Sequence, residues 1–216
     1  MARNQRNGQR KARSIGAKSK TPDLGYYLII TDTKETEQNY MFGLRDSIPE
    51  ELKRRLIIKV SKTKTDNLVN EALSQAALQP QYGEPWIIFD RDQVQNFDDI
   101  IKCADAVAIN VGWSNPCIEI WFNSYFGTMP TYQTSVACCN GFEAKFEKIT
   151  KQKYQKSDKQ IYNKLCRYGN ETEAIKISEN KLKQCIENDV DKPSKMCPAT
   201  TVHRLVKEIK SKIEKE

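Results

Sequence analysis

The sequence lacks the features that mark membrane, secreted and zinc-finger proteins. It has no run of about eighteen apolar residues and no apolar segment typical of a signal peptide, so we expect an intracellular, cytoplasmic protein that does not bind membranes. His203 is the only histidine and no Cys-x-x-Cys pair occurs, which argues against a Cys/His zinc site. We therefore interpret the seven cysteines as small buried hydrophobic residues and ordinary thiols.

Acidic residues are absent from the first 20 positions, although the chain has 28 of them. This segment therefore accounts for the whole net charge of +7, because the remaining residues balance. We predict that residues 1–22 are a disordered tail that binds nucleic-acid phosphates without sequence preference and in a salt-dependent way. The alternative is a tail that only keeps the protein soluble. Its basic residues are Arg3, Arg6, Arg10, Lys11, Arg13, Lys18 and Lys20.

Short apolar runs alternate with amphipathic segments in the first part of the chain. Continuous apolar runs are typical of parallel strands that are covered on both faces. The segments between them repeat apolar residues about every 3.6 positions, which predicts helices. This alternation predicts an α/β fold, a parallel sheet flanked by helices. The expected strands lie at 26–30, 56–60, 86–89 and 106–110.

Beyond about residue 142 the periodicity is that of helices only. The clearest stripe runs from Val202 to Ile213. We predict a domain at 23–140 and a helical C-terminal region at 141–216 that packs on it, although the stripe could instead dock a partner. His203, at the start of this stripe, is expected at the surface or capping the helix.

Polar residues follow three of the predicted strands. Asp32 follows the first strand, Asp90 and Asp92 the third, and Asn115 and Glu119 the fourth. An isolated Asp-x-Asp often only begins a helix, but parallel strands end at one edge of a sheet, so these groups should meet there. Like charges held together need a cation to neutralise them. The pattern therefore predicts Mg²⁺ or Mn²⁺ bound by Asp90, Asp92 and Asp32, with Asn115 and Glu119 supporting.

Residues beside this cluster have alternative roles. Glu37 would either stabilise a helix N-terminus or act as a general base or outer metal ligand. Pro116 is expected in the first turn of a helix, and Asn115 and Glu119 would share one of its faces. Arg91 should point away from its neighbours and make a structural salt bridge rather than bind phosphate.

Several segments are similar in order and spacing to the RloB family, also called the AbiL second-component family. They are residues 29–40, 86–92, 114–121 and 198–206, and the resemblance covers about residues 24–212. It implies a Toprim-like domain, the metal-binding α/β module of topoisomerases, DnaG-type primases and overcoming-lysogenization-defect nucleases. It also implies a prokaryotic phage-defence protein that works with an AAA-type ATPase encoded nearby.

The resemblance implies a metal-dependent nuclease whose catalytic residues are Asp32, Glu37, Asp90 and Asp92. A Mg²⁺ or Mn²⁺ ion would polarise the scissile phosphate, and Asp32 would complete its shell or act as acid or base. The substrate would be DNA, or RNA such as tRNA, and homo-oligomer formation is left open. This chain has Asp32-Thr33 where the family usually has Glu-Gly, and Tyr125 where a histidine is frequent.

Two other functions compete with the nuclease hypothesis. A haloacid-dehalogenase-like phosphatase also uses a strand that ends in Asp-x-Asp, but there the motif lies on the first strand, and here two strand-helix units precede it. A Toprim-like module without catalysis, serving as a regulatory or partner-binding subunit of a defence ATPase, would explain the departures at Asp32 and Thr33.

Overall fold

The computed structural model describes residues 22–32, 35–78, 83–92 and 94–216. The seven basic residues of the predicted tail, and Thr33, lie outside the described residues.

Five strands form one sheet in the order β2-β1-β3-β4-β5. β1, β2, β3 and β4 are parallel, and β5 is antiparallel to β4. The predicted α/β fold with a largely parallel sheet is confirmed. The strands are β1 (Gly25–Thr31), β2 (Leu56–Lys62), β3 (Glu84–Asp90), β4 (Asn110–Asn115) and β5 (Ala199–Thr200).

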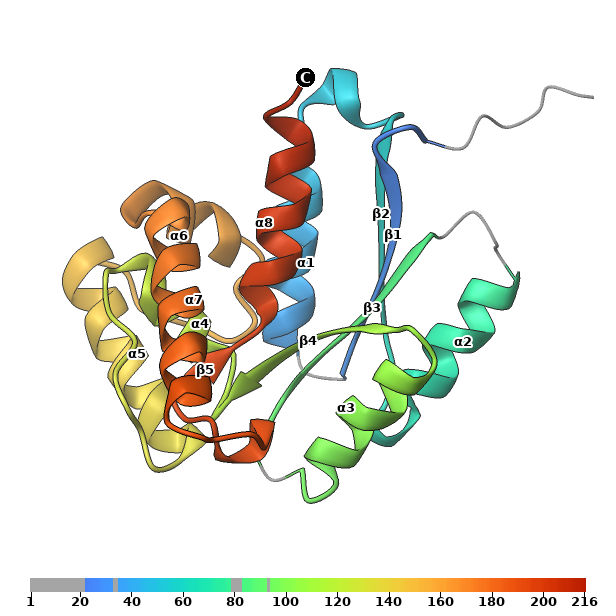
Figure 1. Cartoon of the computed structure of the whole chain (residues 1–216). Helices are drawn as coiled ribbons and strands as arrows, with labels where there is room; N and C mark the ends of the chain where they lie inside the picture. Colours follow the sequence, from blue (N-terminus) through green and yellow to red (C-terminus); the bar gives the residue numbers. More distant parts are fainter. Residues whose placement is uncertain (1–21, 33–34, 79–82, 93) are drawn as a thin grey trace, which may run out of the picture.

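Helices cover both faces of the sheet (Figure 1). α2 and α3 lie on one face, and α1 and α8 on the other, with α4 to α7 beyond them on the α8 side. In the described part of the chain, no helix is both long and apolar enough to cross a bilayer. The bounds are α1 (Glu35–Asp46), α2 (Leu68–Leu78), α3 (Phe97–Ala106), α4 (Glu119–Tyr125), α5 (Ser135–Thr150), α6 (Ile161–Tyr168), α7 (Glu171–Glu187) and α8 (Val202–Ile213).

The middle of β1 is buried on both faces. Tyr27 and Ile29 belong to the apolar cluster beneath α1 and α8, whereas Leu28 and Ile30 belong to the cluster beneath α2 and α3. All four residues are fully buried. Successive side chains of a strand point to opposite faces, so only an unbroken apolar run can serve two cores.

The C-terminal helix packs on its own sheet. Val202, Leu205, Val206 and Ile209 are fully buried in the cluster that also holds α1. This confirms packing within the molecule. The expectation of helices alone beyond residue 142 is wrong, because β5 pairs with the end of β4. A two-residue strand is too short to leave a periodic pattern, and the division of the chain near residue 140 stays a prediction.

The fourth strand lies further along the chain than predicted. α3 continues to Ala106, Ala108 turns the backbone at φ +57°, and β4 begins only at Asn110. This strand looks polar in sequence, but it is central and buried beside α8. Gly112 is needed there, because a Cβ atom would lie 2.4 Å from Ile88 Cδ1.

The end of β4 also differs from the prediction. The Asn115-Pro116 peptide is cis and α4 begins at Glu119, so Pro116 precedes the helix instead of lying in its first turn. Asn115 belongs to the strand and Glu119 to the helix, and they do not share a helix face.

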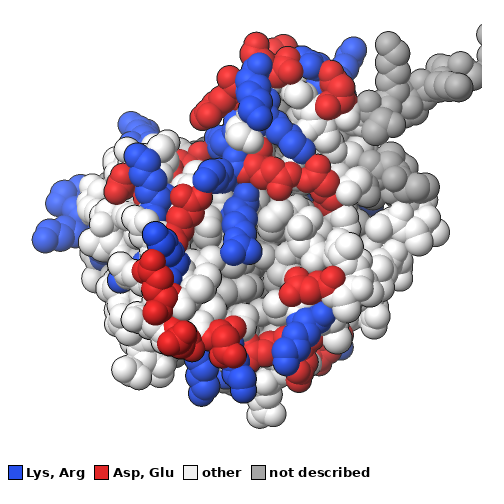
Figure 2. Space-filling view, viewed as in Figure 1, with Lys and Arg blue, Asp and Glu red and all other residues white. Residues whose placement is uncertain are grey.

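Charged groups of both signs interleave over α7 and α8 (Figure 2). Lys207 pairs with Glu179 at 2.5 Å, and Lys210 with Glu171 at 3.2 Å. This face therefore shows no extended surface of one sign.

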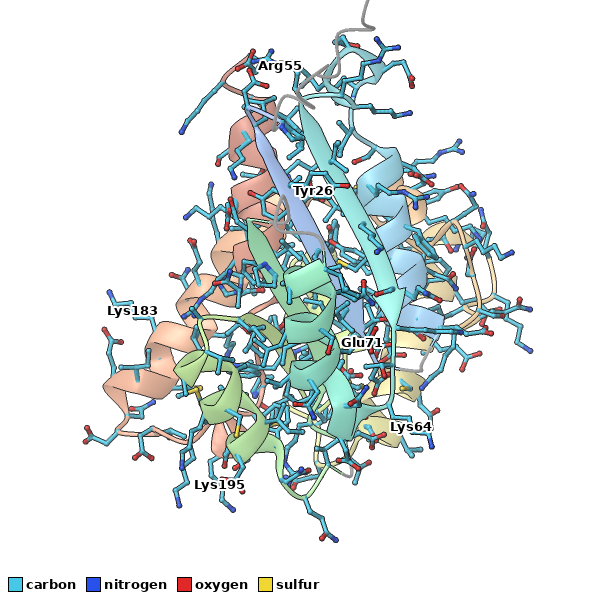
Figure 3. The ribbon with its side chains drawn as sticks, turned by 90° about the vertical axis from the view of Figure 1, so that its right-hand side faces the viewer. Tyr26, Arg55, Lys64, Glu71, Lys183 and Lys195 are labelled. Atoms are coloured by element: carbon cyan, nitrogen blue, oxygen red, sulfur yellow. The ribbon has the colours of Figure 1, made fainter. Side chains whose placement is uncertain are left out.

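Ion pairs close the end of the sheet where β1 begins. Arg55 binds both Asp23 and Glu216 and so ties the C-terminal residue to this end. Figure 3 shows Arg55 at the opposite end of the molecule from Lys64 and Lys195. The other end, where the parallel strands finish, is left for a functional site.

His203 is buried, with 2% of its surface exposed, so its expected surface or capping position is wrong. Burial lowers the pKa of His203 to about 4, and the charge of Arg204 adds to this effect. The fold therefore favours the neutral imidazole.

The first prediction concerns stability in acid. The unfolded chain takes up a proton on His203 near pH 6.5, and the folded chain only near pH 4. The stabilisation of the fold by neutral His203 is therefore complete above pH 6.5 and is lost as pH falls toward 4. The difference is worth about 3 kcal/mol. Urea unfolding at pH 4.5 and 7.0 should show a smaller pH effect in His203→Gln than in the wild type or in Lys176→Gln, an exposed-charge control. An equal pH effect in all three proteins would contradict this assignment.

Candidate active site at the carboxyl ends of the strands

The strand order reverses between β1 and β3. From β1 the chain passes to β2 on one side, and then returns to β3 on the other. In open α/β sheets, ligands bind outside the carboxyl ends of the strands at such a switch point. Asp32 directly follows β1, where its N–H donates to the carbonyl of Ile88 at 3.2 Å, and Asp90 is the last residue of β3.

A cavity of about 780 Å³ opens at this edge. Five carboxylates line it: Glu35, which is exposed, and Glu37, Asp90, Asp92 and Glu119. They come from α1, the end of β3, the loop after it and the start of α4, so the fold brings together groups that are distant in sequence. The other lining residues are Thr36, Cys117, Ile118, Ser135, Val136, Cys139, Asn140, Lys156 and Ser157.

Asp32 is near this cavity but does not line it. It is 4% exposed, and its Oδ2 accepts a hydrogen bond of 3.3 Å from Thr65 Oγ1. The negative charge of Asp32 nevertheless reaches Glu37, whose pKa it helps to raise. Its influence on the site is therefore electrostatic.

Glu37 is the most deeply buried carboxylate of the cavity together with Glu119, each being 1% exposed. Burial raises the pKa of Glu37, a hydrogen bond with Asp90 opposes this, and the charges of Asp32 and Glu119 raise the pKa further. Its Oε2 has no hydrogen-bond partner among the described residues. Glu37 lies in the first turn of α1. This position is compatible both with stabilising the helix N-terminus and with acting as a general base or outer metal ligand.

Asp92 reaches the cavity because of an unusual backbone conformation. Its φ is +24°, a region that side-chain-bearing residues rarely adopt. Its N–H donates to the carbonyl of Pro116 at 3.0 Å, and its Oδ1 accepts a 2.5 Å hydrogen bond from Ser135 Oγ. These contacts hold the turn so that Asp92 lines the same cavity as Asp90.

Arg91 points away from the carboxylates, as expected. The expected salt bridge is not found among the described residues. Its Nη1 donates to the carbonyls of Asp92 at 3.2 Å and Val94 at 2.8 Å, and the guanidinium lies over the Phe97 ring. Arg91 therefore stabilises the loop that carries Asp92.

Asn115 and Glu119 occupy different places. Asn115 Nδ2 donates to the carbonyls of Pro193 and Ser194, each at 3.2 Å, and Asn115 lines a neighbouring cavity that shares Asp92 and Ser135 with the first. Glu119 Oε1 accepts a 2.9 Å hydrogen bond from Tyr154 Oη. The predicted pairing of Asn115 with Glu119 is therefore wrong, and Glu119 alone belongs to the carboxylate group.

Among the cavity residues that sequence reasoning missed, four bear on its chemistry. Lys156 Nζ lies 3.8 Å from Glu119 Oε1, Ser135 binds Asp92, and Cys117 and Cys139 form part of the wall. Only Lys156 lies in the predicted helical region at 141–216, whereas the other three lie in the predicted domain at 23–140, and no local signal marks any of them. The interpretation of the cysteines as buried is correct for Cys117 and Cys138 and wrong for Cys103 and Cys166, which are exposed.

The donor set of the cavity fits a hard divalent cation. Mg²⁺ and Mn²⁺ prefer carboxylate oxygens. Two carboxyl groups such as those of Glu37 and Asp90 can share a hydrogen bond only if one of them carries a proton. A cation can take the place of that proton, and the Oε2 of Glu37 offers a further ligand atom.

These features define an α/β protein with a carboxylate-lined cavity at the switch point of its sheet. The sequence model of the RloB-like proteins matches residues 27–209. The chain therefore belongs to the RloB-like family, and the match spans the described elements from β1 to α8. Comparison with curated proteins and with solved structures found no match.

The second prediction concerns Glu37. Because the pKa of Glu37 is raised in the folded state, protonation of this side chain stabilises the fold. This stabilisation is fully present below the ordinary pKa of 4.5 and is lost as pH rises through the folded pKa. In the presence of EDTA, Glu37→Gln should therefore be more stable than the wild type at pH 8, with a smaller difference at pH 4.5. Denaturant unfolding at both pH values measures this.

Glu35→Gln is the matched control, because Glu35 lies in the same helical turn and lines the same cavity but is exposed. It should unfold like the wild type at both pH values. A gain in Glu37→Gln that is equal at pH 4.5 and pH 8 would show that ionisation of Glu37 does not limit stability.

Proposed function

We propose that this protein is a metal-dependent nuclease that hydrolyses phosphodiester bonds of DNA, or of RNA such as tRNA. The observation that supports this most is the convergence of Glu37, Asp90, Asp92 and Glu119 on one cavity at the sheet's switch point. Mutually repelling carboxylates destabilise a fold, so their retention together favours a function that uses a cation.

Asp90 and Asp92 are the proposed ligands of Mg²⁺ or Mn²⁺, with Glu37 and Glu119 within the same cavity. When bound, the ion would polarise the phosphoryl oxygen and lower the pKa of an attacking water. Ser135 holds Asp92 in position through its 2.5 Å hydrogen bond. Asp32, which we expected to be a ligand, is better suited to raising the pKa of Glu37.

Glu37 is the proposed acid or base. A carboxyl group whose pKa is raised by burial can hold a proton near neutral pH and release it to a neighbouring group. Its hydrogen bond with Asp90 shows that it reaches the predicted ligand set. The ammonium group of Lys156, at the rim with 61% of its side chain exposed, can compensate the charge of a phosphate.

A second cavity, of about 560 Å³, continues the first and shares Glu35 and Ser157 with it. Lys62 and Lys159 line it, and both are exposed. Contacts with phosphates position a nucleic-acid strand without reading its sequence. We propose that the strand lies along these two cavities, while the basic N-terminal segment adds affinity.

Membership of the RloB-like family supports a role in prokaryotic phage defence, as an abortive-infection effector that works with an AAA-type ATPase partner encoded nearby. The second candidate is a non-catalytic regulatory subunit of such an ATPase. It is favoured by Asp32, which lies outside the cavity lining where the family usually has glutamate. Metal-dependent cleavage by the purified chain separates the two.

The third prediction is that Asp90→Asn and Asp92→Asn each lower metal-dependent cleavage by about 100-fold or more. Each substitution removes a charge and keeps the side-chain size. The assay uses the purified full chain with Mg²⁺ or Mn²⁺ and two substrates, labelled DNA and total tRNA. Asp99→Asn, an exposed residue of α3, is the control and should retain full activity.

The two substrates also decide between DNA and RNA. Cleavage that survives in both Asp90→Asn and Asp92→Asn would refute the proposed site. A wild-type chain that binds Mn²⁺ by calorimetry but cleaves neither substrate, alone or with the ATPase, would favour the regulatory candidate.

A further inference from the structure

One wall of the cavity carries a group of side chains with a different chemistry. Cys117, Glu119 and Cys139 each offer one ligand atom, and these three atoms lie within 4.8 Å of one another. Cys117 and Glu119 are 3% and 1% exposed, and Cys139 is half-buried. Two are presented by the turn and first residue of α4 and the third by α5, so the group joins two helices.

The distance between the two sulfur atoms matches a metal site. Cys117 Sγ and Cys139 Sγ are 3.9 Å apart. In a tetrahedral site with Zn–S bonds of about 2.3 Å, two sulfur ligands are separated by about 3.8 Å. A disulfide requires about 2.05 Å, so the two sulfur atoms are not bonded to each other; they make a thiol–thiol hydrogen bond at a separation that two ligands of one ion also have.

We propose that Cys117, Cys139 and Glu119 bind a Zn²⁺ ion whose fourth position faces the cavity. Three protein ligands and one open position are the arrangement of zinc sites that hold a water or a substrate. Thiolates are soft ligands that prefer Zn²⁺ to Mg²⁺, whereas Asp90 and Asp92 prefer a hard ion. This site shares the cavity and the Glu119 carboxylate with the proposed nuclease site, but it takes a different ion and its test needs no nucleic acid.

The surroundings of the three ligands support the assignment. Tyr154 Oη fixes the Glu119 carboxylate through its 2.9 Å hydrogen bond, as groups around metal ligands commonly do. The carbonyl of Ser135 lies 3.7 Å from Cys117 Sγ and accepts from its thiol, a hydrogen bond that is given up when the thiolate binds Zn²⁺. Lys156, the cation nearest to Glu119 in the described part of the chain, is largely exposed and can turn into solvent when Zn²⁺ binds.

This pattern could not be recognised in the sequence. Cys117 and Cys139 are 22 positions apart, and no Cys-x-x-Cys or second histidine marks the group. The spacing of cysteine and histidine argues against a zinc site made of these two residue types alone. It does not argue against a site in which a carboxylate is one of the ligands. Cys117 and Cys139, which we expected to be ordinary thiols, are here proposed ligands.

The fourth prediction uses Co²⁺ as a spectroscopic probe. The full chain is purified under reducing conditions, stripped of metal and titrated with Co²⁺ and then Zn²⁺. We expect a sulfur-to-cobalt charge-transfer band that saturates at one equivalent and is abolished when Zn²⁺ displaces Co²⁺. Cys117→Ser and Cys139→Ser should lose this band, and Glu119→Gln should weaken Zn²⁺ binding at least tenfold.

Two kinds of control make the result specific. Cys103→Ser, at an exposed position of α3, should keep the band. Asp90→Asn and Asp92→Asn should also keep it, which separates this site from the proposed catalytic ions. Circular dichroism checks folding, and if buried Cys117→Ser does not fold, Cys139→Ser and Glu119→Gln carry the test.

Absence of the charge-transfer band from the wild type would overturn the proposal. So would a band that persists in Cys139→Ser, or a Cys117–Cys139 disulfide that forms under the same reducing conditions. The readout uses no nucleic acid, so a failure here leaves the proposed nuclease activity untouched, and inactivity toward nucleic acid leaves this proposal untouched.

Discussion

The concentration of negative charge at the switch point of the sheet is the constraint on which the functional end of this molecule depends. Asp32 and Asp90 must end neighbouring strands, because β1 and β3 are paired in parallel. α1 begins at the same edge, and Glu37 in its first turn makes a hydrogen bond with Asp90 and is subject to the charge of Asp32. The fold cannot relieve this repulsion by moving one strand, since β1 is packed against an apolar core on both faces. Protons, hydrogen bonds or cations must balance it instead.

Much of the fold could be predicted because its most buried elements have clear apolar patterns in the sequence. The unbroken apolar run of β1 is required by burial on both faces, and the stripe of α8 is required by burial on one. The position of β4 was predicted wrongly because this strand is buried without an apolar run. Its close contact with α8 is made through Gly112, and a glycine contributes nothing to a hydrophobic pattern. β5 consists of two residues, too few to show a period.

The candidate site could be predicted in part. Position after a strand was enough to find Glu37, Asp90 and Asp92, because parallel strands finish at one edge. It was not enough for Asn115, whose side chain turns to the carbonyls of Pro193 and Ser194. Ser135, Lys156 and Cys139 reach the cavity only through the packing of α5 and the segment after it. Such tertiary contacts have no counterpart in the local sequence.

The origin of the cavity wall has a consequence for when the protein becomes functional. One side comes from the strands and α1, but Ser135, Cys139 and Lys156 come from much later in the chain. During synthesis the carboxylates are made first, and the wall that encloses them follows. β5, later still, has to pair with β4 before the sheet is complete. A partly made or truncated chain thus lacks an assembled site, which delays its chemistry until the whole protein has folded.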